Sequence, residues 1–389
     1  MDQSKYNTLR AAFADISDPR KARGKRFPWL FLLLLIALAL ASGQKTIHAI
    51  AHWVTLHADE LRTQLEWGEA PFPSESTLRR TLRWIPALQL ETVLGGLALG
   101  TPSSAPAIPA DAVSEPLCGQ AIDGKQVRGV RAHGEPHHLV SLVQHADASI
   151  AGQTKVAEKS NEITAVPVLL AGRDLKGTVT TMDALLTQRT IAQQILDQQG
   201  HYLMMVKANQ PELYQAIEFL FANPPWTKQE QPREYWKHKT MNKGHGRLEY
   251  RTLETSTALC AYLDWPQLGQ VMRRTCRRVD CKTGEVSEQV RYGITSLKPW
   301  QADAATLERL WRDHWTIENK VHYVRDVTLG EDAGQVRSGA APQNLAALRN
   351  ALLNLFRANG WQNMSDALRY YSSKVARAYA LLTTCPTRL

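Results

Sequence analysis

The stretch CGQAIDGKQVRG at residues 118–129 places Asp123 directly after a short apolar run and before a glycine. A second stretch, GTVTTMDALLTQ at residues 177–188, repeats this arrangement, with Asp183 after a β-branched run. Such runs favour strands, so both patterns predict an aspartate at the end of a strand. Taken singly, each aspartate also has an ordinary structural explanation, an Asp-Gly turn for Asp123 and a helix N-cap for Asp183.

Short strands and helices alternate around these two aspartates. The apolar or β-branched runs predict strands at 139–143, 179–182 and 202–206. Helical stretches are predicted between or after them, at 163–170 and 184–199. Strands that alternate with helices are typical of an α/β sheet.

A third carboxylate lies on a predicted helix, LERLWRDHWTIENKVHYVRD at residues 307–326. Counting by threes and fours from Glu318 places His314, His322 and Arg325 near one face of that helix. The alternative for Glu318 is a solvated helix with a salt bridge.

The three carboxylates together favour a metal site. Two strand-end aspartates and a later helical glutamate can converge on a pair of Mg²⁺ ions, which prefer oxygen ligands and keep several waters. Two ions about 4 Å apart stabilise the attacking and the leaving oxygen of a phosphoryl displacement. If the phosphoryl group belongs to DNA, a basic protein surface would bind the phosphates of that substrate.

The composition agrees with a polyanionic partner. The 389 residues include 46 Lys and Arg against 37 Asp and Glu, a formal net charge of +9. This balance favours nucleic acid or a membrane surface. Five cysteines exclude a disulfide scaffold and fit a reducing cytoplasm. A structural zinc site is not expected at the lone pair Cys276 and Cys281, nor at four nearby histidines, His133, His137, His138 and His145.

Residues 1–99 carry helical patterns. The run WLFLLLLIALALAS at 29–42 follows a basic segment and imitates a signal peptide, but about 14 residues are too few to span a bilayer. We expect a buried helix there, with a membrane or secretory role as the alternative. Further on, Ser74 is a candidate N-cap of a helix that carries three arginines, Arg79, Arg80 and Arg83. Two helices joined by a turn, the second rich in Arg, resemble a helix-turn-helix; an ordinary bundle with a basic face is the alternative.

Two other segments differ from their surroundings. Residues 100–117 are rich in Pro, Ala and Ser and predict a linker. Residues 215–298 are polar, basic and strand-like, which predicts a β-rich insertion with a hairpin turn at 280–284. We expect its clustered arginines to face solvent or DNA phosphates: Arg273, Arg274, Arg277 and Arg278.

Long stretches of the chain closely resemble bacterial insertion-sequence transposases of the DDE class, in the branch that includes the H-repeat-associated proteins of Rhs elements. The resemblance covers nearly the whole chain. Its strongest stretches are DGKQVRG (123–129), GQTKVAEKSNEITAVPVLL (152–170), GTVTTMDALLTQRTIAQQI (177–195), YLMMVKANQPEL (202–213) and HWTIENKVHYVRDVTLGEDAGQVRSG (314–339).

The resemblance implies an α/β fold with an RNase H-like catalytic core, a mixed sheet flanked by helices. It implies Asp123, Asp183 and Glu318 as the catalytic, metal-binding triad. The expected division of the chain is an N-terminal helical, end-binding domain (1–99), a linker (100–117), the first part of the core (118–214), the β-rich insertion (215–298), and the second part of the core with the glutamate helix and the C-terminal helices (299–389).

Related transposases carry a Tyr-Arg-Glu-Lys signature around the glutamate. The corresponding positions here hold Trp311, His314, Glu318 and Arg325, so the tyrosine and the first arginine are replaced. Contacts with DNA are expected at Lys125, Lys155, Lys159, Lys207, His314, Arg325, Arg79, Arg80 and Arg83. Weaker expectations, of base contacts or of bracing the site, attach to Asn161, Glu162, Asn209 and Gln210.

The implied function is metal-dependent cleavage at insertion-sequence ends and strand transfer into target DNA. The implied cofactor is Mg²⁺, with Mn²⁺ as a substitute and two ions per site. A homodimer or higher assembly on DNA, no membrane, and a cytoplasmic, nucleoid-associated location are expected. The alternatives are a stand-alone nuclease and a non-mobile DNA-binding protein derived from such a transposase.

Overall fold

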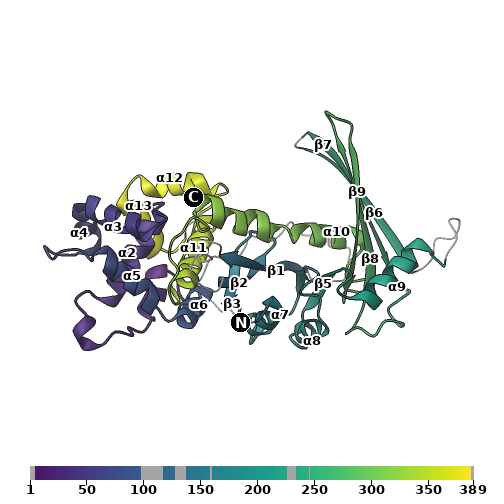
Figure 1. The fold of residues 1–389 in the computed structure, drawn as a ribbon, viewed down its shortest axis with the longest axis horizontal. Helices are drawn as coiled ribbons and strands as arrows, with labels where there is room; N and C mark the ends of the chain where they lie inside the picture. Colours follow the sequence, from purple (N-terminus) through teal and green to yellow (C-terminus); the bar gives the residue numbers. More distant parts are fainter. Residues whose placement is uncertain are drawn as a thin grey trace.

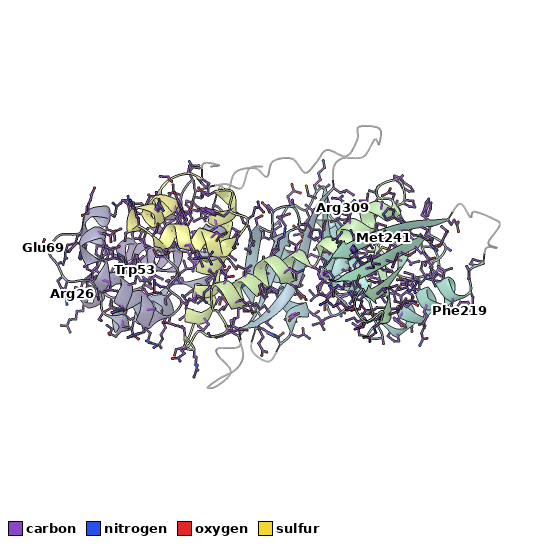
Figure 2. All side chains as sticks on the ribbon, turned by 90° about the horizontal axis from the view of Figure 1, so that it is seen from above. Arg26, Trp53, Glu69, Phe219, Met241 and Arg309 are labelled. Atoms are coloured by element: carbon purple, nitrogen blue, oxygen red, sulfur yellow. The ribbon has the colours of Figure 1, made fainter. Side chains whose placement is uncertain are left out.

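The computed structural model describes residues 5–97, 117–127, 137–157, 160–225, 234–244 and 246–386. The predicted linker, apart from Leu117, lies outside these residues. The molecule is elongated, with a helical part at one end, a sheet in the middle and long β-strands at the other end (Figure 1). In the view from above, Arg26 and Glu69 mark the helical end, and Met241 and Phe219 mark the opposite end (Figure 2).

The N-terminal part is helical, as expected. Its α-helices are α1 (Leu9–Ala14), α2 (Trp29–Ala41), α3 (Ile47–Leu56), α4 (Ala58–Leu65), α5 (Glu75–Trp84) and α6 (Ala87–Gly95), with a short 3₁₀ turn at Ala22–Gly24. The apolar run forms α2, and nearly all its side chains are buried, which confirms the predicted buried helix. Across the described residues, no helix has both the length and the apolar character that crossing a bilayer requires.

The C-terminal helices share the hydrophobic core of the N-terminal helices. They are α11 (Ala341–Ala358), α12 (Met364–Ser372) and α13 (Val375–Thr383). Helix α11 packs against α5 and α6, and α13 packs against α1, α2 and α4, so the N-terminal and C-terminal helices lie side by side (Figure 1). Helix α11 also packs against β2 and β3, so it contacts both the N-terminal helices and the sheet. Helical periodicity shows which face of a helix is apolar but does not identify its partner.

The central sheet has the expected mixed topology. Its first five strands are β1 (Cys118–Val127), β2 (His137–Gln144), β3 (Ile150–Lys155), β4 (Thr178–Met182) and β5 (His201–Val206). They lie in the order β3-β2-β1-β4-β5. The first three are antiparallel neighbours, and β4 and β5 run parallel to β1. With α7 (Glu162–Leu170) and α8 (Arg189–Asp197) packed against it, this sheet confirms the RNase H-like class.

Helix α8 begins later than the apolar periodicity predicted. It starts at Arg189, because the residues after Asp183 form a turn. The hydroxyl of Thr187 donates to the backbone oxygens of Asp183, at 3.1 Å, and of Met205, at 2.5 Å. Asp183 is therefore in a turn after a strand and does not cap a helix.

The insertion extends the central sheet. It contains α9 (Pro211–Ala222) and four antiparallel strands, β6 (Tyr235–Gly244), β7 (Arg247–Ser256), β8 (Gln270–Asp280) and β9 (Val286–Thr295). Strand β9 pairs with β5, so all nine strands form one sheet. The predicted turn joins β8 to β9, where the amide of Gly284 donates to the oxygen of Asp280 at 2.9 Å.

The segment that carries Glu318 is less regular than predicted. Helix α10 (Ala304–Asp313) is followed by two short π-helices, Ile317–His322 and Val324–Thr328. A π-helix forms i→i+5 hydrogen bonds and is frequently found at functional sites. Of the side chains predicted to share one face, His314 and Glu318 line one pocket and His322 lies 3.5 Å from Asp123 in it, whereas Arg325 pairs with Glu331.

Candidate active site

Three carboxylates from distant parts of the sequence line one pocket of about 440 Å³, namely Asp123, Asp183 and Glu318. Strands β1 and β4 are parallel, with Ile122 opposite Met182. The next residue after each of them is an aspartate, so the two aspartates lie side by side. The predicted strand end is right for Asp183, which follows β4, but wrong for Asp123, because β1 continues to Val127 and pairs Asp123 with Ser141 of β2. Glu318 reaches the pocket from the first π-helix, which packs against β1.

The pocket concentrates negative charge. Burial, together with the nearby carboxylates of Asp183, Glu162 and Glu318, raises the pKa of Asp123 to about 8. Burial and Asp183 also raise the pKa of Glu318, whereas the guanidinium of Arg291 lowers it. Mutual repulsion of this kind is relieved when a cation binds between the carboxylates.

The donor set suits a hard divalent cation. Carboxylate oxygens are the ligands that Mg²⁺ and Mn²⁺ prefer. Within the described part of the chain, however, no three His, Cys, Asp or Glu side chains stand close enough together to form a finished metal cage. The three carboxylates thus line one pocket, and the charge of Asp183 affects the other two. To bind an ion, their side chains would have to move closer together.

A fourth carboxylate, Glu162, lies beside the pocket. A Cβ atom at Gly124 would overlap its carboxyl group, so the glycine after Asp123 leaves the space that Glu162 fills. Burial raises the pKa of Glu162, and His138, 4.0 Å away, lowers it. The sequence predicted only a weak role for Glu162, a base contact or bracing of the site. Gly124, directly after Asp123, was the sequence feature that could have indicated a close neighbour at this position.

His314 is buried, although a contact with DNA was expected. Its Nδ1 lies 3.0 Å from Oγ1 of Thr181 on β4, and Nε2 of His145 lies 3.1 Å from the same hydroxyl. Burial lowers the pKa of His314 to about 4 and that of His145 to about 3. His314 therefore connects the end of α10 to β4, and it lines the same pocket as the three carboxylates.

Two expected DNA contacts, Lys125 and Arg325, are buried in ion pairs. Nζ of Lys125 lies 2.5 Å from Asp326 and 3.7 Å from Asp332. Arg325 has no exposed surface, and its Nη2 lies 2.7 Å from Glu331. Neither side chain can reach a phosphate without a rearrangement. The sequence does not show whether a lysine or arginine is buried in an ion pair or faces solvent, because both kinds recur at the same residue spacing along a helix or strand.

The remaining lysines differ in their surroundings. Lys207 is exposed and lines the carboxylate pocket. Lys155, at the end of β3, is partly exposed. Lys159 lies outside the described residues.

Polar side chains brace the loops around the pocket. Nδ2 of Asn209 donates to the backbone oxygen of Ala184 at 2.8 Å, and Nε2 of Gln210 donates to that of Thr187 at 2.9 Å. Asn161 caps α7. These contacts support the loop after Asp183 and the helix that carries Glu162.

Helix α5 presents the three arginines expected to contact DNA. Arg79, Arg80 and Arg83 are exposed, and the predicted apolar face is buried. Arg79 also pairs with Glu75 on the same helix. Ser74 is the N-cap residue, as predicted, although its hydroxyl contacts other hydroxyl groups and caps no backbone amide.

The arginines of β8 divide between two faces of the sheet, because successive side chains on a strand alternate. Arg273 pairs with Glu254 at 2.8 Å, and Arg274 pairs with Glu308 at 2.8 Å. Arg278 pairs with Glu249 at 3.2 Å, and Arg277 is exposed. The cluster expected to face solvent or phosphate is thus largely paired with carboxylates.

The tryptophan at the tyrosine position of the signature lies in the protein interior, and so does part of the histidine cluster. Trp311 is fully buried, and a Cβ atom at Gly293 would collide with its ring. Of the four histidines, His137 is buried, His138 faces Glu162 and His145 contacts Thr181, whereas His133 lies outside the described residues.

Two family models match the chain in succession. Residues 10–98 match the DDE_Tnp_1-associated family. Residues 114–355 match the transposase DDE domain family, which covers more than half of the chain.

Several curated proteins are similar in sequence. "Putative transposase YncI" of Escherichia coli O157:H7 is 33% identical over 246 residues, 61% of each chain. "H repeat-associated putative transposase YhhI" of Escherichia coli K12 is 33% identical over 60% of this chain and 63% of its own. The chain thus spans about three fifths of the length of these relatives. An uncharacterized protein from the dhlA 3′ region of Xanthobacter autotrophicus is 30% identical over 73% of this chain and 92% of its own.

One solved structure with a similar arrangement is the piggyBac transposase synaptic complex with hairpin DNA. It is 8% identical, with a TM-score of 0.41, over 97% of this chain and 79% of that one.

Proposed function

The chain belongs to the family of transposase DDE domains, and we propose that it cuts DNA at the ends of a mobile element and joins those ends to target DNA. One observation carries the proposal. Asp123, Asp183 and Glu318 line a single pocket; Asp123 lies within β1, Asp183 directly after the parallel strand β4, and Glu318 on a π-helix. The names of the relatives YncI and YhhI support it.

The carboxylates would act as ligands in both chemical steps. Asp123, Asp183 and Glu318 would hold two Mg²⁺ ions, with Mn²⁺ as a substitute. When bound, two such ions activate an attacking oxygen and stabilise the leaving oxygen of an in-line displacement. Lys207, exposed at the rim of the pocket, would contact the scissile phosphate.

The reaction then needs no covalent enzyme intermediate. In the first step a water oxygen bonds to phosphorus, the bond to the 3′-oxygen breaks, and that oxygen takes a proton to become a free hydroxyl. In the second step this hydroxyl attacks a phosphate of target DNA and displaces the 3′-oxygen of the target strand. The number of phosphodiester bonds is unchanged in the second step.

Recognition of the element ends is assigned to the helical region 1–99. The exposed arginines of α5 (Arg79, Arg80 and Arg83) would contact the DNA, as the second helix of a helix-turn-helix does. A reaction on two ends requires two active sites, which favours a dimer or a higher assembly on DNA. An enzyme with this substrate works in the cytoplasm, at the nucleoid.

End recognition needs a test in the full-length chain. Helices α1, α2 and α4 pack against α13, so removing either end of the chain would expose a shared core. Replacing Arg79, Arg80 and Arg83 together by Gln should weaken binding to element ends and remove the preference for them over unrelated DNA. A full preference retained by the triple variant would assign the recognition to another element.

The direct test of function uses duplexes that carry the inverted repeats flanking the gene, a supercoiled target plasmid and Mg²⁺. Cleavage at the repeat followed by joining to the plasmid is the expected result. Cleavage without joining would indicate a stand-alone nuclease, and binding without cleavage would indicate a non-mobile DNA-binding protein. Either of these results would contradict the proposal.

A further inference from the structure

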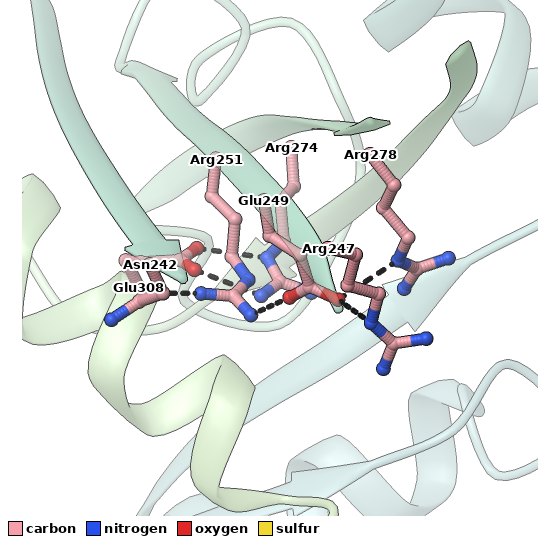
Figure 3. A network of polar contacts seen from close by, with 7 residues as sticks. All are labelled: Asn242, Arg247, Glu249, Arg251, Arg274, Arg278 and Glu308. Atoms are coloured by element: carbon pink, nitrogen blue, oxygen red, sulfur yellow. Dashed lines mark hydrogen bonds and ion pairs between the residues drawn. The ribbon is translucent and has the colours of Figure 1, made fainter. Parts of the chain in front are cut away.

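A second pocket, the arginine groove, lies between the inserted strands and the glutamate segment. Its volume is about 480 Å³. Seven cationic side chains line it, and the only acidic side chain among its lining residues is Asp313; the cations are Arg247, Arg251, Arg274, Arg278, Arg291, Arg312 and Lys320. Figure 3 shows several of these guanidinium groups converging from β7 and β8.

Two glutamates, the half-buried Glu249 and the buried Glu308, neutralise part of this charge. The carboxylate of Glu249 pairs with three arginines, Arg247 at 3.1 Å, Arg278 at 3.2 Å, and Arg251 (Figure 3). One carboxylate can balance only one of these three charges. The groove keeps a surplus of positive charge even after Arg274 is matched by Glu308.

Arg291 is one of the cations that line the groove. Burial and the neighbouring charges of Arg274 and Arg278 lower its pKa. Holding like charges together in this way costs free energy, and a bound polyanion would remove that cost.

The groove is continuous with the carboxylate pocket. Gln289, Arg291 and Trp315 line both. The guanidinium of Arg291 lies 5.7 Å from the centre of the Trp315 ring, and this ring remains 37% exposed. An exposed aromatic ring beside a row of cations is the arrangement by which proteins bind single-stranded nucleic acid, with bases stacked on the ring and phosphates held by the cations.

We infer that the arginine groove binds an unpaired segment of the DNA strand that enters the carboxylate pocket. Arg291 and Arg312 hold its phosphates, and a base stacks on Trp315. The inference rests on the proposed function, because it assigns the groove to the same DNA. It adds that the strand is unpaired beside the cleavage site, since a recess of about 480 Å³ is the size of a small-ligand pocket.

The test measures binding of the full chain to a labelled 12-nucleotide single strand and to its duplex, in EDTA and over a range of salt concentrations. The double variant Arg291→Gln/Arg312→Gln should bind the single strand more weakly. Its slope of log K against log salt should fall by about 1.4, since each phosphate contact contributes about 0.7 with a single strand. Arg277→Gln is the matched control, because this exposed arginine of β8 does not line the groove.

A second variant tests the stacking. Trp315→Ala should weaken single-strand binding about tenfold, in the range found for loss of one stacked base, and change duplex binding much less. Equal losses for single strand and duplex would overturn the assignment to an unpaired strand. Affinities and slopes like those of Arg277→Gln would overturn the assignment of the groove. Thermal melting curves identify any variant that loses its fold.

These outcomes are separate from those of the catalytic proposal. Binding in EDTA does not require cleavage, so Asp123→Asn should bind the single strand at least as well as the wild type. If cleavage were absent and the groove variants still lost binding, the groove would stand and the catalytic proposal would fail. If cleavage were present and the groove variants bound normally, the catalytic proposal would stand and the assignment of the groove would fail.

Discussion

Nδ1 of His322 lies 3.5 Å from Oδ2 of Asp123. This contact joins the π-helix that carries Glu318 to the strand that carries the first aspartate. Burial, together with the charges of Arg325 and Lys125, lowers the pKa of His322 to about 3, so the ring is neutral at neutral pH. The histidine therefore connects two of the three proposed metal ligands without adding charge to the site.

His322 should act as a positioning residue. His322→Ala should lower the affinity for Mn²⁺ and the cleavage rate about 10–100-fold, the range typical when a group that orients a metal ligand is lost. Asn has an amide nitrogen near the position of Nδ1, so His322→Asn should retain more of both. The measurements are Mn²⁺ titration calorimetry and kcat against KM. Equal metal affinity in wild type and His322→Ala would exclude this role.

Gly124 should be required for its lack of a side chain. Gly124→Ala would push a Cβ atom into the carboxyl group of Glu162; because this is the flexible end of that side chain, the cost should lie at the low end of the about 1–3 kcal/mol typical of overpacking. Gly68→Ala is the control, because a Cβ atom there meets no atom within 4 Å. Thermal melting should show a lower Tm for Gly124→Ala alone. Adding Glu162→Ala should restore much of the loss, and a double variant no more stable than Gly124→Ala would contradict the explanation.

The buried ion pairs behind the site should matter for stability. Glu331 accepts from Arg325 at 2.7 Å and from Arg349 at 3.4 Å, and all three are buried. Glu331→Gln would leave two buried guanidinium groups without a counter-charge, so a loss of about 3–5 kcal/mol in unfolding free energy is expected. The surface pair of Arg369 and Asp366 is the control, and Asp366→Asn should cost less than about 1 kcal/mol. Denaturant unfolding that gives equal losses would refute the expectation.

The sequence predicted the parts of the site that follow from local patterns. Asp123 and Asp183 come after recognisable apolar or β-branched runs, and the strand register brings them together. The positions of Lys125 and Arg325 could not be predicted, because ion pairing with Asp326 and Glu331 depends on tertiary packing.

Two larger features also escaped prediction. The π-helical turns around Glu318 have no known sequence rule as simple as helical periodicity. The packing of α13 on the N-terminal helices depends on which apolar faces fit together. In both cases the sequence shows which residues are apolar but does not show which other residues they pack against.

Glu91 should make stability depend on pH. It lies between α6 and the sheet, where Nε2 of Gln153 donates to it at 2.9 Å and Gln343 and Arg325 lie nearby. Burial raises its pKa from 4.5 to about 7. A carboxyl group with a raised pKa in the folded state contributes stability that is fully present below pH 4.5 and lost as the pH rises through about 7.

Glu91→Gln keeps the shape and removes this titration. The variant should gain stability relative to the wild type between about pH 5 and pH 8, by about 1–3 kcal/mol. Chemical denaturation at several pH values measures the difference. A difference that stays constant over this range would show that Glu91 does not titrate in the folded state as described.

The central claim is that Asp123, Asp183 and Glu318 act together at one DNA-cutting centre. It is tested most directly by the cleavage rate of element-end DNA, in Mg²⁺ and in Mn²⁺, for Asp123→Asn, Asp183→Asn and Glu318→Gln. Asp197→Asn, exposed at the end of α8, is the control. The prediction is that each of the three variants folds and binds DNA but does not cleave, while the control cleaves at the wild-type rate. Wild-type cleavage by any of the three would contradict the account.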